Sequence, residues 1–250
     1  MRSGTFVLTA AFVAAIAGSA GAQTDPPLTP LQVAIGCASR PSLDLPPADA
    51  LRVIGGQDTV PKRVFGARDL IVVAGGTQAG VQLGQQFFIR RSSRAVMDGY
   101  GSGRSSTTMG WIRVVAVNDT TAIGTVERAC GGIIAGDFLE PFAPIVVPPD
   151  ADRDVTTGEP DFAALGRVVI ASEGHLSAGL GDFVLIDRGA DQGVGAGTRF
   201  AIYRDLRVGG MPLASVGEGI VISTSESMAL TRITRARDAV IPGDYIAVRK

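Results

Sequence analysis

Short runs of apolar and β-branched residues, separated by polar turns, recur along the chain. Residues 70–73 and 183–186 are uniformly apolar, which predicts strands buried on both faces. Around Phe87 and Phe200, apolar residues alternate with other residues at a period of two, which predicts strands with one face on a core. Neither half of the chain shows the spacing of an amphipathic helix. The pattern therefore predicts an all-β protein.

Two polar stretches lie between apolar segments and predict hairpin turns. Residues 111–117 are expected to pair with residues 122–128 across the polar residues between them. In the same way, residues 219–224 are expected to pair with residues 229–234. Together with the other runs, each half of the chain would contain five or six strands.

The two halves of the chain repeat each other in two gap-free blocks. The first block begins at Asp69 and ends at Arg91, and its matched residues recur 113 positions later, between Asp182 and Arg204. The second block recurs 107 positions later. Its shared residues include Gly110, Val114, Ala122, Arg128 and Asp137, which correspond to Gly217, Val221, Ala229, Arg235 and Asp244. The difference between these two offsets, 113 and 107 positions, falls in one variable connection between the blocks. We therefore infer an internal duplication.

Glycines in the repeated blocks predict turns of the backbone. A Gly-x-x-x-Gly-Val-x-x-Gly motif occurs in both copies, where glycine would reach positive φ and valine would enter the core. A Gly-Asp pair follows near the end of each copy, and its aspartate is expected to accept backbone amide hydrogens. These structural-turn residues are Gly76, Gly80, Gly84, Gly136, Asp137, Gly189, Gly193, Gly197, Gly243 and Asp244.

Prolines gather in two regions and divide the chain. Because proline lacks an amide donor, these regions predict an extended leader and an inter-domain linker. The expected organisation is a pair of tandem, internally duplicated small β-barrels of the SH3-like or cradle-loop-like kind. Its segments are a signal peptide at 1–22, a proline-rich extended leader at 23–50, a first barrel at 51–147, a linker at 148–164 and a second barrel at 165–250.

The order of these motifs resembles that of known envelope modules. The Gly-x-x-x-Gly-Val-x-x-Gly-x-x-Phe-x-Ile motif, a hairpin and a hydrophobic Gly-Asp box are similar to the C-terminal domain of the flagellar assembly protein FlgT. The Gly-Asp turn also resembles the box of cradle-loop and double-psi barrels. The resemblance covers residues 66–140 and 179–249. It implies binding or assembly without catalysis, and it does not imply a flagellar role.

The first 22 residues have the features of a secretory signal. Arg2 supplies the positive start, residues 6–17 are apolar, and small residues occupy positions 20–22. We expect cleavage and a periplasmic or secreted protein without a transmembrane segment. In such an oxidising compartment, Cys37 and Cys130 are expected to form a disulfide. The alternative is a pair of unrelated buried thiols.

Charge and histidine content exclude several kinds of function. The formal net charge is −1, which gives no electrostatic reason to expect nucleic acid as a partner. The chain has one histidine, so a histidine-rich metal site is not expected, and neither is any cofactor. That residue, His175, lies near Asp182, but no Gly-x-Ser-x-Gly elbow accompanies it. We interpret it as a loop residue.

The variable connection at residues 92–109 is the candidate binding loop. It is rich in serine, glycine and arginine, and functional surfaces often lie on such loops. Its candidate residues, with the arginine that precedes it, are Arg91, Arg94, Tyr100 and Arg104. The alternative is a solvated, disordered loop.

These observations predict a non-enzymatic, exported binding or assembly protein. Its partner would be another envelope protein or a cell-wall glycan, and the repeated residues describe turns rather than reactive groups. Two alternatives remain at this point. One is a hydrolase that uses His175 with a nearby serine or aspartate, and the other is a structural spacer that presents the leader.

Overall fold

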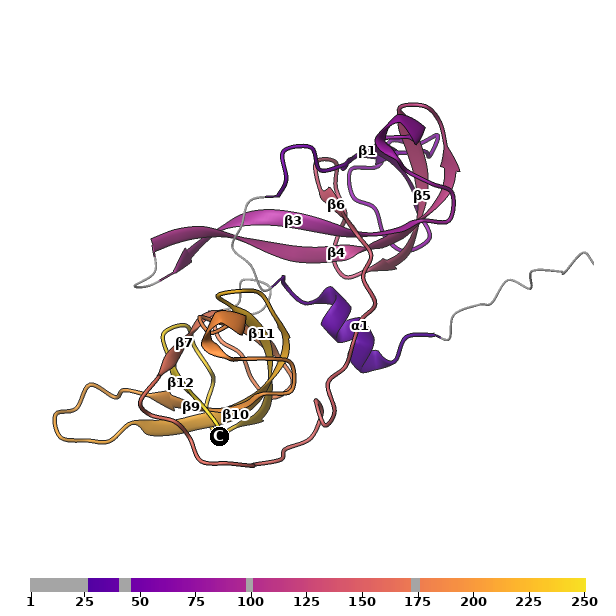
Figure 1. Cartoon of the computed structure of the whole chain (residues 1–250). Helices are drawn as coiled ribbons and strands as arrows, with labels where there is room; N and C mark the ends of the chain where they lie inside the picture. Colours follow the sequence, from indigo (N-terminus) through magenta and orange to yellow (C-terminus); the bar gives the residue numbers. More distant parts are fainter. Residues whose placement is uncertain (1–26, 41–45, 98–100, 172–175) are drawn as a thin grey trace, which may run out of the picture.

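Both copies of the repeated sequence fold into closed, antiparallel barrels of six strands (Figure 1). The structure, a computed structural model, describes residues 27–40, 46–97, 101–171 and 176–250. The first barrel contains β1 (Arg52–Gly56), β2 (Leu70–Ala74), β3 (Gln86–Met97), β4 (Gly101–Val117), β5 (Thr121–Ala129) and β6 (Phe138–Pro141). The second contains β7 (Gly166–Ala171), β8 (Phe183–Ile186), β9 (Arg199–Arg204), β10 (Ala214–Thr224), β11 (Ala229–Ala236) and β12 (Tyr245–Val248).

The order of strands around the two barrels is the same. Neighbours run β1-β2-β5-β4-β3-β6 in the first barrel and β7-β8-β11-β10-β9-β12 in the second. The first and last strands of each copy also meet at equivalent residues, Arg52 with Phe138 and Arg167 with Tyr245. The expected all-β fold of two duplicated barrels is therefore confirmed.

Both expected hairpins form. Val117 pairs with Ala122 and Trp111 pairs with Arg128 between β4 and β5. In the second barrel, Thr224 of β10 pairs with Ala229 of β11. Period-two patterning and the polar turns were sufficient here because hairpin register is a local property.

Each barrel encloses a separate hydrophobic core. Side chains from all six strands and from the glycine-rich turns fill it, as expected for a small closed barrel. Ile71, Ile89 and Ile112 are fully buried in the first core, and Ile186, Ile202 and Ile246 are fully buried in the second.

The repeated glycines have two different structural roles. Gly80 and Gly193 end short 3-10 helices, η1 (Thr77–Ala79) and η3 (Ala190–Gln192), in the left-handed conformation at φ 75° and 73°. Gly189 does not use positive φ, contrary to expectation, and neither does its counterpart Gly76. A Cβ atom there would lie 2.0 Å from the Asn118 carbonyl oxygen, so this glycine permits a close approach of two backbones.

One helix, α1 (Pro30–Cys37), interrupts the leader, which the proline content predicted to be extended. Thr29 caps it, since the Thr29 hydroxyl accepts the Gln32 amide hydrogen and the Gln32 side chain accepts the Thr29 amide hydrogen. Pro30 occupies the first turn, where its missing donor has no cost. The local capping residues thus override the expectation of extended chain.

The helix covers the outer surface of the second barrel. Leu31, Ile35 and Ala38 pack against a third hydrophobic cluster, which also receives Ala151 from the linker and Val147, which the sequence had assigned to the first barrel. The barrel residues of this cluster are Val169, Ile170, Phe183, Leu185, Ile220, Ile222, Met228 and Leu230. The second barrel is therefore apolar on both its inner and its outer face here.

This cover explains a difference between two equivalent strands. All four residues of β8 are buried, as the sequence predicted. In β2, Ile71 and Val73 are buried, but Leu70 remains 38% exposed and Val72 is half-buried. The prediction that residues 70–73 are buried on both faces was therefore wrong, because none of the described segments covers this strand as α1 and the linker cover β8.

A disulfide between Cys37 and Cys130 connects α1 to the first barrel. The two Cα atoms are 5.4 Å apart, and Cys130 directly follows β5. The predicted disulfide is confirmed. Because the apolar side of the same helix packs on the second barrel, α1 lies between the barrels and contacts both (Figure 1).

The expected binding loop is a long β-hairpin. Its strands β3 and β4 pair continuously from Arg90 and Thr108 out to Met97 and Gly101, so residues 92–97 and 101–109 are not a disordered loop. The hairpin extends beyond the first barrel, and β3 contacts β7 (Figure 1).

The linker lies against the second barrel and is held there by arginines. Arg199 donates to the carbonyl oxygens of Asp150 and Arg153, at 2.8 and 3.0 Å. Arg232 donates to Ala151 O at 2.9 Å, and Arg235 pairs with Asp154 at 2.7 Å. These contacts give the linker a fixed path.

Candidate functional site

The Gly136–Asp137 turn is held by an arginine from β3. Arg91 Nε and Nη2 donate to the two carboxylate oxygens of Asp137, at 2.7 and 2.8 Å. Asp137 Oδ2 also accepts the Ile134 amide hydrogen at 2.9 Å, and its side chain is only 2% exposed. The predicted acceptance of a backbone amide is thus confirmed, and the buried charge has a bidentate counterion.

The second copy reproduces this geometry atom by atom. Arg204 Nε and Nη2 donate to Asp244 at 2.7 and 2.8 Å, and Asp244 Oδ2 accepts the Ile241 amide hydrogen at 2.9 Å. In both copies, the hydrogen bonds to the aspartate raise the pKa of the arginine above its ordinary value. Arg91 and Arg204 are therefore cations at any physiological pH.

A second arginine holds each turn from the other side. Arg52 Nη1 donates to Gly136 O at 3.1 Å, and Arg167 Nη1 donates to Gly243 O at 3.1 Å. We name these two sets the arginine clamps. The first clamp consists of Arg52, Arg91, Gly136 and Asp137, and the second consists of Arg167, Arg204, Gly243 and Asp244.

The clamps were not predicted, although the sequence contained a signal for them. Arg91 and Arg204 recur in the first repeated block, and Asp137 and Asp244 recur in the second. A repeated cation and a repeated anion in a protein with few charges indicate an ion pair. Arg91, a candidate binding residue, lies in the first clamp, where it fixes a turn.

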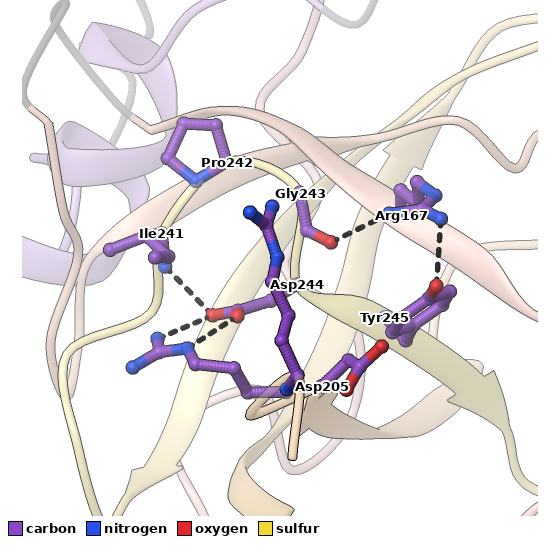
Figure 2. Close-up of a pocket in the computed structure, with 9 residues that line it drawn as sticks. Arg167, Asp205, Ile241, Pro242, Gly243, Asp244 and Tyr245 are labelled. Atoms are coloured by element: carbon purple, nitrogen blue, oxygen red, sulfur yellow. Dashed lines mark hydrogen bonds and ion pairs between the residues drawn. The ribbon is translucent and has the colours of Figure 1, made fainter. Parts of the chain in front are cut away.

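A cavity of about 550 Å³ lies beside the second clamp (Figure 2). In this view, Arg167 and Tyr245 lie together on one side, and Ile241 and Pro242 lie on the other. Tyr245 Oη accepts a hydrogen bond from Arg167 Nη2 at 2.8 Å, and the Arg167 guanidinium lies 4.1 Å from the centroid of the tyrosine ring. This is a pocket with oriented polar groups and an apolar wall, as small-ligand sites usually have.

A smaller cavity of about 300 Å³ lies beside the disulfide. Cys130, Met109 and Arg91 are among the residues that line it. It is thus close to the first clamp.

The other candidate binding residues lie on the long hairpin. Arg94 of β3 and Arg104 of β4 pair in register, so both belong to the part of the hairpin beyond the barrel. Tyr100 lies outside the described residues. A binding role for this hairpin stays a prediction.

The groups of the alternative hydrolase are only partly described. His175 and the signal peptide at 1–22 lie outside the described residues. Asp182 Oδ2 accepts the Gly179 amide hydrogen at 2.8 Å, as Asp69 Oδ2 accepts that of Gly66 at 2.9 Å in the first copy. Asp182 therefore has the turn-forming role of its counterpart.

The described residues contain neither a cluster suited to a metal ion nor a membrane-crossing helix. No three His, Cys, Asp or Glu side chains gather there as a metal site would require. Nor does that part of the chain contain a helix with the length and apolarity needed to cross a membrane. A comparison of the chain with known protein families and with curated proteins finds no match.

Proposed function

We propose that this chain is an exported, non-catalytic binding or assembly protein of the cell envelope, which recognises another envelope protein or a cell-wall glycan. The disulfide supports an oxidising compartment, because such bonds are rare in cytosolic proteins. The resemblance of the turn motifs to envelope barrel modules points the same way.

One observation carries the proposal of binding without catalysis. Among the charged residues that both copies share, Arg91 with Asp137 and Arg204 with Asp244 are used in the two clamps, where each arginine is bound to a turn, and Asp69 and Asp182 accept backbone amide hydrogens of other turns. The copies differ most in the connection between their third and fourth strands. It is the long β3–β4 hairpin in the first barrel and a short segment at residues 205–213 in the second. Duplication with divergence at one surface element is typical of a binding scaffold.

The long hairpin is the recognition element in this proposal. It places Arg94 and Arg104 side by side in the ladder, beyond the barrel that supports them. Arginines on a rigid element are suited to bind carboxylates or the hydroxyl-rich surface of a glycan.

The test compares two matched variants of the full chain. Purified cell-wall glycan and solubilised envelope proteins are each passed over the immobilised protein, and retained material is quantified. We expect the double variant Arg94→Gln, Arg104→Gln to retain several-fold less of one of the two materials than the unchanged protein. The control, Arg63→Gln with Arg128→Gln, changes two exposed arginines of the same barrel and should behave as the unchanged protein.

Equal retention by both double variants would contradict the role of the hairpin. Failure of the unchanged protein to retain either material would contradict the proposed function itself.

A further inference from the structure

The cavity of the second barrel carries an excess of positive charge. Arg167, Arg204, Arg207, Asp205 and Asp244 are its charged lining residues, so its net charge is +1. The question is which of these charges are compensated within the protein.

Both aspartates already have partners. Asp244 accepts the two hydrogen bonds of Arg204 and the amide hydrogen of Ile241. Asp205 Oδ1 accepts the Arg207 amide hydrogen at 2.7 Å, which closes the turn after β9. Arg204 is thus the counterion of Asp244, while the Asp205 carboxylate accepts a backbone amide hydrogen.

Arg167 and Arg207 have no such counterion. In the described part of the chain, neither guanidinium lies within ion-pair distance of a carboxylate. Arg167 is bound by two neutral acceptors, Gly243 O and Tyr245 Oη, and its planar group stacks on the tyrosine ring. These contacts orient the guanidinium before any ligand arrives, and they leave some of its five N–H donors free.

Arg207 adopts a backbone conformation that is uncommon for a side-chain-bearing residue. Its φ is 56°, in the left-handed region. It is exposed at the rim of the cavity, and the Asp205 carboxylate stabilises this turn. Unfavourable backbone conformations that a side chain maintains beside a cavity often have a functional reason.

The first barrel lacks these two features, although it has the same clamp. Phe138 occupies the place of Tyr245, so Arg52 has no hydroxyl acceptor at this position. The segment that contains Arg207 is replaced by the long hairpin. The tyrosine hydroxyl and Arg207 are therefore not needed to build the barrel.

We propose that this cavity binds a carboxylate group between Arg167 and Arg207. The oriented guanidinium of Arg167 can donate two parallel hydrogen bonds to it, and Arg207 closes the site from the rim. A carboxylate carries a single negative charge, whereas a phosphate dianion would bring a second negative charge close to Asp205, Asp244 and Asp238, the last of which also pairs with Arg204. This inference goes beyond the proposed function and does not depend on where the protein is located or on its hairpin.

The test is an NMR titration of the full chain with two acids that differ in source. Glucuronate represents an acidic sugar, and N-acetylalanine represents the C-terminus of a peptide. Glucose and N-acetylalaninamide are their neutral controls. We expect saturable shifts of the amide signals of residues 241–245 with at least one acid and with neither neutral compound. The acid that binds more tightly identifies the source of the carboxylate.

Three variants locate the site. Arg207→Gln should weaken the binding of the acid about tenfold, because it removes one charge-assisted contact. Tyr245→Phe introduces the residue of the first barrel and should weaken binding by releasing Arg167, while the fold is kept. Arg68→Gln is the matched control, since Arg68 is also exposed and left-handed, at φ 74°, but lies in the first barrel.

Three results would overturn the proposal. They are no saturable shift with either acid, equal shifts with the neutral compounds, and an unchanged affinity in Arg207→Gln.

Discussion

Individual arginines hold turns of this protein that lie outside its hydrophobic cores. The turns at Asp137 and Asp244 lie at the barrel ends, where a carboxylate is buried and must be paired. Arg91 and Arg204 supply that pairing with planar, bidentate contacts, which lysine cannot make. The clamps are thus one use of the arginines that make up all but two of the 23 basic residues of the chain.

Removal of one carboxylate charge should therefore destabilise the barrel that contains it. We expect Asp244→Asn to lower the free energy of unfolding by about 3 kcal/mol, because it removes the bidentate carboxylate partner of Arg204 and leaves this arginine only the exposed Asp238, at 3.1 Å. Asp137→Asn should lower the free energy of unfolding by less, because the side chain of Arg91 is 35% exposed and can be solvated more easily than that of Arg204, which is 22% exposed. Denaturant unfolding would measure both values.

The control for this prediction is a pair at the surface. Glu127→Gln weakens the exposed Arg113–Glu127 pair and should cost less than about 1 kcal/mol. If Asp244→Asn costs no more than this control, the clamp does not stabilise the fold.

The elements differ in how far local sequence predicted them. The β4–β5 and β10–β11 hairpins were predicted because period-two patterning and a polar turn act over a few residues. Helix α1 was missed although Thr29 and Gln32 form a capping box, because its eight residues lie in a proline-rich segment. The hairpin beyond Arg90 was missed because its polar residues are also typical of loops.

The exposure of β2 and the burial of β8 depend on long-range packing. Their sequences are equally apolar, and only the contact of α1 and the linker with one of them makes the difference. The clamps, too, depend on contacts between residues 40 to 84 positions apart. A pattern of local propensities contains no information on such contacts.

The packing of α1 can be tested at the level of the element. Ile35→Asp places a charge in the apolar cluster and should detach the helix from the second barrel, while the disulfide keeps it on the first. We expect faster amide hydrogen exchange in α1, β8 and β10 and little change in the first barrel. Ala34→Asp changes an exposed residue of the same helix and is the control. Equal exchange in both variants would show that α1 does not depend on this cluster.

At the scale of the whole molecule, two barrels of one ancestry are joined through an unrelated segment. The helix precedes both barrels in sequence but contacts both in space. The linker completes the junction by covering the same outer face of the second barrel. The disulfide and this apolar cluster thus hold the barrels together, along with the arginine contacts of the linker and the contact of β3 with β7.

Loss of the covalent bond should therefore affect stability strongly. The disulfide closes a loop with a sequence separation of 93 residues, and the chain-entropy model gives about 4 kcal/mol for such a loop. We expect the double variant Cys37→Ser, Cys130→Ser to unfold at clearly lower denaturant concentration, with the loss confined to the first barrel. The unchanged protein under reducing conditions should match it, and a midpoint that reduction does not alter would contradict the prediction.

The same bond also determines how the molecule would bear mechanical tension. A force applied between the leader and the C-terminal strand would pass from Cys37 directly to Cys130, and strands β1 to β5 lie within the covalent loop that this path bypasses. Only β6 of the first barrel would carry load, together with the linker and the second barrel. Under tension the second barrel would act as the extensible part, and most of the first would be shielded as long as its two sulfur atoms remain joined.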